Sequence, residues 1–261
     1  MAFLTRKVRF SPDASDGAPG RNGYGGVPAI RGLGRHYELE VICRGEPDPT
    51  TGYVRNIKDI DHAVRDHALD IIRRAIKEGR EPAGLLPELV SSIGAALGSP
   101  PAGLVLWLSP YHGYEMSESG TVLIRQKFDF AAAHRLWVAG WTDEANQSCF
   151  GRCMNPNGHG HNYQLETCVG TPLRDRGAPA LSLDRLEMIV DDRVIRRFDH
   201  RNLNLDVEEF RDGTGLLPTV ENIARVCFTL LDAPLRETCA GCRLRWVTVW
   251  ETDRTSARYP G

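Results

Sequence analysis

The pattern of apolar and polar positions repeats itself along the chain. Four segments of the first half match four of the second half in the same order, namely 32–40 with 158–166, 54–60 with 181–186, 84–87 with 215–218, and 104–108 with 247–251. Apolar residues alternate with polar ones in the outer pairs, which predicts strands, whereas the two inner pairs open amphipathic helices. The sequence therefore predicts two copies of a strand–strand–helix–helix–strand–strand unit, joined near His112 to Gly120.

Two long loops are predicted at matching places in the two copies. Residues 11–34 are rich in Gly and Pro and are expected to connect the first two strands of the first copy. Residues 134–158 are expected to make the same connection in the second copy. The second loop lies next to the residues that carry the candidate chemistry of this chain.

The overall composition has neither a basic nor an apolar bias. The chain has 261 residues, of which 41% are hydrophobic and 25% charged, and this suits one large domain or two small ones. The formal net charge is −2, so nothing points to nucleic acid or to an anionic membrane as a partner. The first residues, MAFLTRKVRF, lack the apolar core of a signal peptide, and no apolar run approaches the ~20 residues of a membrane span. The cytoplasm is therefore the expected location.

Cysteine use argues against a disulfide framework. Seven cysteines are an odd and modest number for this length, which favours free thiols or metal ligands. Cys239 and Cys242 have the Cys-x-x-Cys spacing of a redox pair or of half a zinc ribbon, but the chain has no second pair. They fall between a predicted helix and the last predicted strand, and we predict a surface loop with two free thiols.

Three histidines of the second copy are candidate metal ligands. His134 follows a strand-like segment, and His159 and His161 are two residues apart on the next one. Residues i and i+2 of a strand point to one face, and Gly160 between them lets the backbone approach closely. Three imidazoles around an open position are typical of catalytic zinc. The spacing alone also fits two polar histidines on an exposed strand face.

A longer pattern surrounds these histidines. Cys153 lies six residues before His159 in the segment 153–163 (CMNPNGHGHNY), which resembles the active-site segment of the 6-pyruvoyl-tetrahydropterin synthase family. The resemblance continues through three more segments in the family's order, 198–206 (FDHRNLNLD), 218–224 (PTVENIA) and 250–252 (WET). It covers nearly the whole second copy.

The resemblance implies a metal site and a proton-transfer group. The ligands of a Zn²⁺ cofactor would be His134, His159 and His161. Cys153 would be the general acid/base, polarised by Asp199 and His200. A thiol acts as a base only when its thiolate is populated, which a nearby imidazolium or metal promotes. Cys149, four residues earlier, is an alternative thiol, although the spacing to the histidines favours Cys153.

The resemblance also implies a pterin pocket. Glu251 would accept two parallel N–H bonds from the pyrimidine edge of the pterin, and Thr219 and Glu221 would contribute to the same pocket. Glu221 also suits the first turn of a helix, where the dipole favours an acid. Family members often have two consecutive threonines before this glutamate, whereas this chain has Thr219 followed by Val220.

The implied fold is α+β, with two tandem tunnelling-fold units. Each unit would be a four-stranded antiparallel sheet with two helices on one face. Residues 118–261 would be the catalytic unit, and residues 1–117 a degenerate copy without a zinc site. In that copy, the positions of His159, His161, Glu221 and Glu251 are occupied by Leu33, Arg35, Val90 and Leu108. Family members close their small sheets by oligomerising, so a homo-oligomer with active sites at subunit interfaces is expected.

The implied activity is that of a lyase, the zinc-dependent conversion of 7,8-dihydroneopterin triphosphate to 6-pyruvoyl-tetrahydropterin with loss of triphosphate, a step of tetrahydrobiopterin biosynthesis. The same residues would also suit a 6-carboxy-5,6,7,8-tetrahydropterin synthase of the queuosine pathway, or an activity like that of dihydroneopterin aldolase. Two other classes stay open, a metal-dependent nucleobase hydrolase and a non-catalytic pterin-binding scaffold. A hydrolase would need further His or Asp ligands in a β/α barrel, and joint retention of Cys153, Asp199 and His200 argues against a scaffold.

Overall fold

The computed structural model describes residues 1–13 and 23–260 and belongs to the α+β class. The chain divides into two compact units, Met1–Arg125 with Gly170–Ala180 and Gln126–Val169 with Leu181–Gly261. In each unit the long strands and helices follow the predicted order of two strands, helices and two more strands, although in the second unit a helix lies between the first two strands and a two-residue strand lies among the helices. Within the described residues, every helix is too short or too polar to cross a membrane. The boundary after residue 117 and the duplication itself stay predictions.

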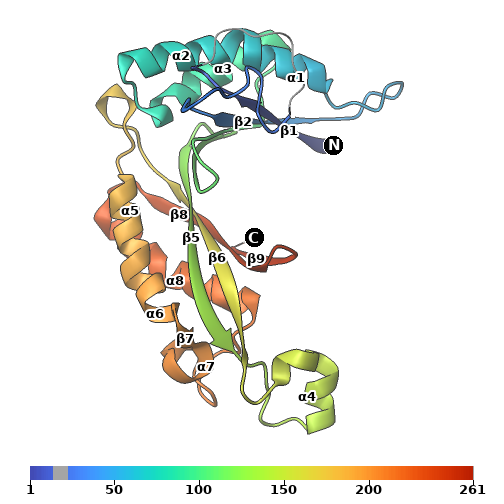
Figure 1. The fold of residues 1–261 in the computed structure, drawn as a ribbon, viewed down its shortest axis with the longest axis vertical. Coiled ribbons are helices and arrows are strands. Elements are labelled where there is room, and N and C mark those ends of the chain that lie inside the picture. Colours follow the sequence, from blue (N-terminus) through green and yellow to red (C-terminus); the bar gives the residue numbers. More distant parts are fainter. Residues whose placement is uncertain (14–22, 261) are drawn as a thin grey trace. The chain divides into compact units, whose positions relative to one another are not determined.

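The first unit is an antiparallel sheet with helices on one face (Figure 1). Its strands are neighbours in the order β1-β2-β3-β4. Asn56 caps the first helix by accepting the N–H of Lys58, and Gly79, with a φ of 62°, ends the second. The elements are β1 (Ala2–Phe10), β2 (Tyr37–Gly45), α1 (Ile57–Ala63), a π-helical turn (Val64–Ala68), α2 (Leu69–Glu78), α3 (Leu86–Leu97), β3 (Gly103–Trp107) and β4 (His112–Ser117).

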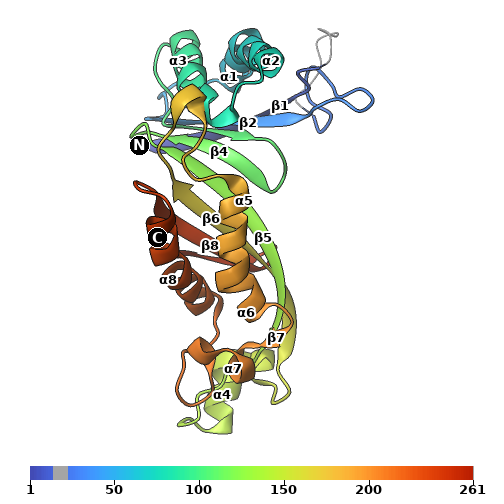
Figure 2. The ribbon, with the colours of Figure 1, turned by 90° about the vertical axis from the view of Figure 1, so that its left-hand side faces the viewer.

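The second unit has the same kind of arrangement, with α5, α6 and α8 on one face of its sheet (Figure 2). Strand β6 lies between β5 and β8, β9 pairs antiparallel with β8, and the short β7 runs parallel to the end of β5. The strands are β5 (Val122–His134), β6 (His159–Gly170), β7 (Arg201–Asn202), β8 (Arg243–Thr252) and β9 (Thr255–Tyr259). The helices are α4 (Asp143–Phe150), α5 (Leu183–Val190), a π-helical turn (Asp191–Ile195), α6 (Arg196–Phe198), α7 (Leu203–Asp206) and α8 (Val220–Thr238).

Alternation along the strands of the second unit builds its core. The rings of Phe130 on β5 and Tyr163 on β6 stack with their centroids 5.0 Å apart, and both side chains are buried. Phe198 of α6 meets Phe130 edge-on at 5.8 Å, while Val247 and Val249 of β8 are fully buried. Side chains two residues apart on a strand share a face. Polar side chains at even spacings from Phe130 on β5 or from Tyr163 on β6 therefore lie on the same sheet face as the core.

The two predicted loops have different outcomes. Of residues 11–34, the part from 14 to 22 lies outside the described residues, and the remainder contains neither helix nor strand. The prediction of a plain loop over 134–158 is wrong, because helix α4 forms within it. Thr142 caps α4 by accepting the Ala145 N–H at 3.2 Å, and Asp143 and Glu144 place negative charge in its first turn. These local signals were sufficient to start a short helix.

The prediction of free surface thiols at Cys239 and Cys242 is also wrong. The two cysteines do occupy the turn between α8 and β8, but they are joined by a disulfide and both side chains are buried. The Cys242 N–H donates to the Cys239 carbonyl at 3.0 Å, which closes the turn and brings the two Cα atoms to 5.3 Å. That separation is within the usual range for a disulfide.

Candidate metal centre

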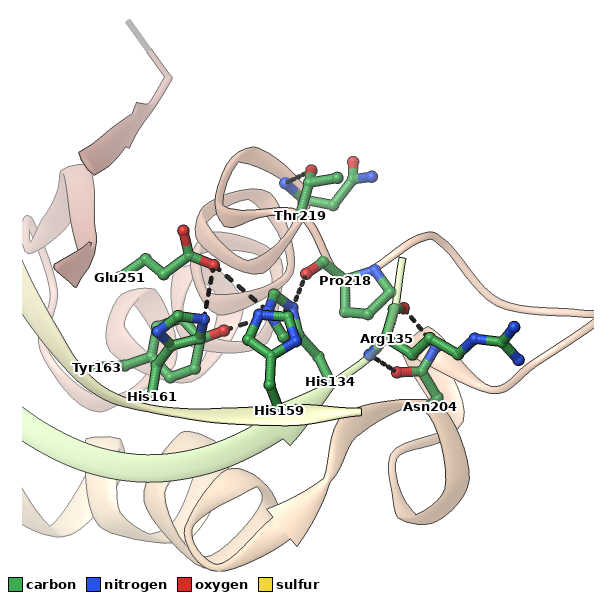
Figure 3. Close-up of polar contacts among 10 residues, drawn as sticks. His134, Arg135, His159, His161, Tyr163, Asn204, Pro218, Thr219 and Glu251 are labelled. Carbon is green, nitrogen blue, oxygen red and sulfur yellow. Dashed lines mark hydrogen bonds and ion pairs between the residues drawn. The ribbon is translucent and has the colours of Figure 1, made fainter. Parts of the chain in front are cut away.

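Three imidazoles converge at the ends of two neighbouring strands (Figure 3). His134 is the last residue of β5, and His159 and His161 lie at the start of β6. Their ligand atoms all lie within 4.8 Å of one another, and the Nε2 atoms of His134 and His159 are 3.1 Å apart. His134 is fully buried and the other two are half-buried. The i, i+2 spacing on β6 and the adjacent strand end thus bring three potential ligands together.

The hydrogen bonds of His134 leave one ring nitrogen available as a ligand. Its Nδ1–H donates to the carbonyl of Pro218 at 2.7 Å, so its Nε2 carries the lone pair that faces the cluster. Burial foremost, together with the neighbouring His159 and His161, lowers the pKa of His134 to about 4, against the opposing effect of the bond to Pro218. Burial and His161 also lower the pKa of His159, against the opposing effect of Glu251. Both rings are therefore neutral at neutral pH, the form that binds metal.

The donor set fits a divalent metal such as zinc. The Nε2 of His161 is buried and makes no hydrogen bond in the described part of the chain. The Glu251 carboxylate lies 3.4 Å from it, and a buried nitrogen without a hydrogen-bond partner is costly unless something binds it. Three imidazole nitrogens directed at one point are also the protein ligands of a typical catalytic zinc site, which keeps a fourth position open.

Glu251 borders the histidine cluster. It lies near the end of β8, and its Oε1 is 3.4 Å from the Nε2 atoms of both His134 and His161. Its side chain is 20% exposed, so Glu251 is not fully enclosed by the protein. The residue expected to hold the pterin therefore lies directly beside the candidate metal ligands.

The Cys153 thiol sits on a short helical turn, Gly151–Met154, that is tied to the end of β5. The Cys153 carbonyl accepts the Leu136 N–H at 2.8 Å. Burial first, and then the charge of Glu251, raise the pKa of the Cys153 thiol. In the chain alone, this thiol is therefore protonated at neutral pH. The alternative thiol, Cys149, is exposed on α4.

Asp199 and His200 form a pair of their own. Asp199 accepts the Ala131 N–H at 2.8 Å and the His200 Nδ1–H at 2.8 Å, and these bonds, the backbone one foremost, lower the pKa of its carboxyl. His200 has a positive φ of 57° and a side chain that is 83% exposed. Among the described residues, no hydrogen bond joins this pair to Cys153. Within the described residues, the expected relay therefore has its Asp199–His200 bond but lacks a hydrogen bond to the thiol.

The two candidate residues at the start of α8 differ in their surroundings. Thr219 caps the helix, accepting the Asn222 N–H at 3.4 Å, and follows directly the proline whose carbonyl holds His134 (Figure 3). Glu221 is exposed in the first turn. The position of Glu221 matches the helix-dipole interpretation, whereas Thr219 lies close to the candidate metal site.

A sequence model of the family described as 6-pyruvoyl tetrahydropterin synthase matches residues 123–261, more than half of the chain. The chain belongs to this family. The matched residues include the three clustered histidines, Cys153, Glu251, the Asp199–His200 pair and the start of α8. The family match and the geometry therefore single out the same unit.

Three relatives match about half of this chain along nearly all of their own length. The protein of Homo sapiens named 6-pyruvoyl tetrahydrobiopterin synthase is 33% identical over 138 residues, which are 53% of this chain and 90% of that protein. The Dictyostelium discoideum protein of the same name is 29% identical over 143 residues, covering 55% and 98%. The solved 6-pyruvoyl tetrahydropterin synthase of Caenorhabditis elegans is 31% identical, covers 54% of this chain and 96% of that one, and has a TM-score of 0.47.

Some residues that shape this family site were missed from the sequence. Pro218 contributes a carbonyl, which any residue type could supply, so its role has no sequence signal. Tyr163 is fully buried with its hydroxyl 3.5 Å from His134 Nδ1, and it reads in sequence as an ordinary strand residue. Asn204 binds the backbone next to His134, and its one sequence signal is its place in the matching segment 198–206.

The first unit offers no comparable set of ligands at the positions that the repeat aligns with the family site. Leu33 is fully exposed before β2, and Arg35 binds the carboxylate of Asp13 through its N–H at 2.6 Å and its Nη1 at 2.8 Å. Over residues 1–13 and 23–260, the three-histidine group is the one cluster of His, Cys, Asp and Glu suited to a metal. The hypothesis of a degenerate family copy stays a prediction.

Proposed function

We propose that the second unit converts 7,8-dihydroneopterin triphosphate to 6-pyruvoyl-tetrahydropterin with loss of triphosphate. The observation that carries this proposal is the convergence of three histidines, flanked by Glu251 and the Cys153 turn, inside the range matched by the family. The curated relatives carry the name of this synthase. A cytoplasmic homo-oligomer completes the proposal.

The metal would be Zn²⁺, held by His134, His159 and His161. When bound there, zinc supplies Lewis-acid polarisation of adjacent substrate oxygens. The protein's own contribution is to keep His134 neutral through burial and to orient its ring through the bond to the Pro218 carbonyl. A fourth position left open by three protein ligands gives the substrate access.

Glu251 and Cys153 would act on the pterin. The Glu251 carboxylate accepts the adjacent N–H groups of the pyrimidine edge, which positions the substrate side chain beside the histidines. Cys153 transfers protons at its Sγ. The negative charge of Glu251 raises the pKa of this thiol. The N–H groups of the pterin and the bound Zn²⁺ would offset that charge, so they would also favour the thiolate.

The Asp199–His200 pair would act across a subunit interface. Its imidazole is exposed and makes no hydrogen bond to Cys153 within the described chain, so in an assembly of copies it is available to a neighbouring site. Asp199 fixes the ring by accepting from Nδ1, which leaves Nε2 free to exchange protons. The proposal of a homo-oligomer with sites at its interfaces is supported by the exposure of the His200 imidazole and by the family resemblance.

The decisive test is the identity of the product. Incubation of the zinc-loaded protein with 7,8-dihydroneopterin triphosphate should release triphosphate and a pterin with the mass of 6-pyruvoyl-tetrahydropterin. A product with the mass of 6-carboxytetrahydropterin would assign the chain to the queuosine-type reaction, and a cleaved side chain without triphosphate release would indicate an aldolase. No turnover with retained pterin binding would favour a scaffold.

Glu251→Gln should weaken pterin binding without changing the zinc content. The amide keeps the shape but offers one acceptor oxygen and turns its N–H group toward the N–H donors of the pterin. A buried, charge-assisted pair is lost, and the affinity for neopterin should fall by roughly 10–1000-fold. Titration calorimetry measures this, with Glu187→Gln, an exposed residue of α5, as the matched control. Unchanged affinity would remove Glu251 from the pterin pocket.

A further inference from the structure

The two residues that follow His134 connect the histidine cluster to the Cys153 turn. The Leu136 N–H donates to the carbonyl of Cys153 at 2.8 Å. The Arg135 Nε donates to the carbonyl of Met154 at 2.9 Å. Since β5 ends at His134, these bonds replace the strand pairing that would otherwise fix the chain here. The position of the Cys153 turn therefore depends on how firmly Arg135 and Leu136 are held.

Asn204 holds the backbone of Arg135 on both sides (Figure 3). Its Oδ1 accepts the Arg135 N–H at 2.8 Å, and its Nδ2 donates to the Arg135 carbonyl at 3.0 Å. The second Nδ2 hydrogen donates to the Asp212 carboxylate at 2.9 Å. A carboxylate only accepts, so Asp212 fixes which end of the amide faces which backbone group. Asn204 is 4% exposed, and both hydrogens of its amide are used.

Asn204 also belongs to the segment that carries the Asp199–His200 pair. It lies in the single-turn helix α7, which Asn202 caps by accepting the Asn204 N–H at 3.1 Å. Beyond the pairing of β7 with β5 and the bond from Ala131 to Asp199, this buried amide extends the connection between the segment of the exposed pair and β5 to the residue after His134. The bonds from Arg135 and Leu136 then extend this connection to Cys153.

We infer that Asn204 is a positioning residue for the His134 ligand and for the Cys153 turn. It contacts neither side chain and acts through the backbone of Arg135. The inference rests on the proposed function in so far as the histidines hold a metal. Partners outside the ligand shell of a metal typically change its affinity by about 10–100-fold.

The first test is Asn204→Leu, which keeps the approximate size of the side chain and removes all three bonds. Its expected effect is a rise of about 10–100-fold in the Kd for Co²⁺, followed through the visible absorption bands of the bound ion. In the same protein, the alkylation rate of Cys153 by iodoacetamide should rise about fivefold or more, because its turn loosens. Peptide mass spectrometry separates the thiols, and the exposed Cys149 is the internal reference.

The chain offers a closely matched control in Asn146. This residue is fully buried and holds the backbone of Val138 in the same way, accepting its N–H at 2.9 Å and donating to its carbonyl at 3.1 Å. Its second amide hydrogen donates to the Thr142 carbonyl at 3.1 Å. Asn146→Leu should leave the Co²⁺ affinity unchanged, since Val138 is not adjacent to a ligand. An equal loss of Co²⁺ affinity in Asn204→Leu and Asn146→Leu would overturn the inference, because the loss of any buried amide would then be enough to weaken metal binding.

A second variant separates the two effects and guards against misfolding of Asn204→Leu. Arg135→Met removes the side-chain bond to Met154 but keeps the backbone that Asn204 holds. It should speed alkylation of Cys153 and leave the Co²⁺ affinity as in the unmodified protein. Unchanged Co²⁺ affinity and unchanged Cys153 alkylation in Asn204→Leu would refute the positioning role. If the unmodified protein bound no Co²⁺, the proposed metal site would fail, whereas the alkylation rates would still decide whether Asn204 holds the Cys153 turn.

Discussion

His159→Ala is expected to abolish zinc binding while leaving the second unit folded. The Nε2 of His159 lies 3.1 Å from that of His134, so its loss opens one side of the cluster. Two imidazoles remain, fewer than the three protein ligands of typical catalytic zinc sites. The side chain is half-buried at the start of β6, away from the aromatic core of Phe130 and Tyr163. The fold should therefore tolerate its removal.

Metal analysis of the purified protein measures this directly. The unmodified chain should contain one zinc, and His159→Ala none. His62→Ala is the control, since this side chain is 73% exposed on α1 and its removal should leave one zinc per chain. Two zincs per chain would show that the first unit also binds metal. A zinc-free unmodified protein, even after incubation with the ion, would remove the metal from the proposed function.

The part of the site that could be predicted is the part encoded by local periodicity. The spacing of His159 and His161 on an alternating segment places both on one face of a strand, and the structure has them there. His134 at the end of the neighbouring strand brings the third ring. Alternation along the strands also accounts for the burial of Phe130, Tyr163 and Val247. The antiparallel sheet with helices on one face is implied by the family resemblance, and each unit has a sheet with helices on one face.

What could not be predicted depends on contacts between distant residues. The bond from His134 to the Pro218 carbonyl spans 84 positions, and that from Arg135 to Asn204 spans 69. Neither leaves a periodic or compositional trace, because a carbonyl is present in every residue and an isolated asparagine suits any turn. The disulfide between Cys239 and Cys242 likewise depends on the geometry of the turn after α8. The residue types alone do not determine the geometry of this turn.

One irregularity shared by the two units supports the predicted duplication. In each unit the first long helix is interrupted by a π-helical turn, Val64–Ala68 after α1 and Asp191–Ile195 after α5. Such turns are rare, and general packing rules do not require one at this place. Two unrelated units can share an order of strands and helices through packing alone. A π-helical turn at the same place in both units is harder to explain without a common origin.

Cys153→Ala should keep the affinity for zinc and pterin but lower turnover by about 100-fold or more, the usual scale for loss of a general acid/base. The thiol is not among the clustered ligand atoms, so the metal site is retained. Removing Sγ from the half-buried turn changes little of its packing, because the turn is held through the carbonyls of Cys153 and Met154. The measurement is the rate of triphosphate release at saturating substrate, with zinc content and neopterin affinity determined on the same sample.

Cys149→Ala is the matched control for this prediction and should turn over at nearly the unmodified rate. Both cysteines lie within the same segment, but Cys149 is exposed on α4, whereas Cys153 is close enough to Glu251 for that carboxylate to raise its pKa. Only a thiol beside the pterin anchor can exchange protons with the substrate side chain. If Cys149→Ala lost turnover and Cys153→Ala kept it, the catalytic thiol would be Cys149. The 6-pyruvoyl product would then lose the support of the match between Cys153 and the family segment, and the product assay would decide among the alternatives.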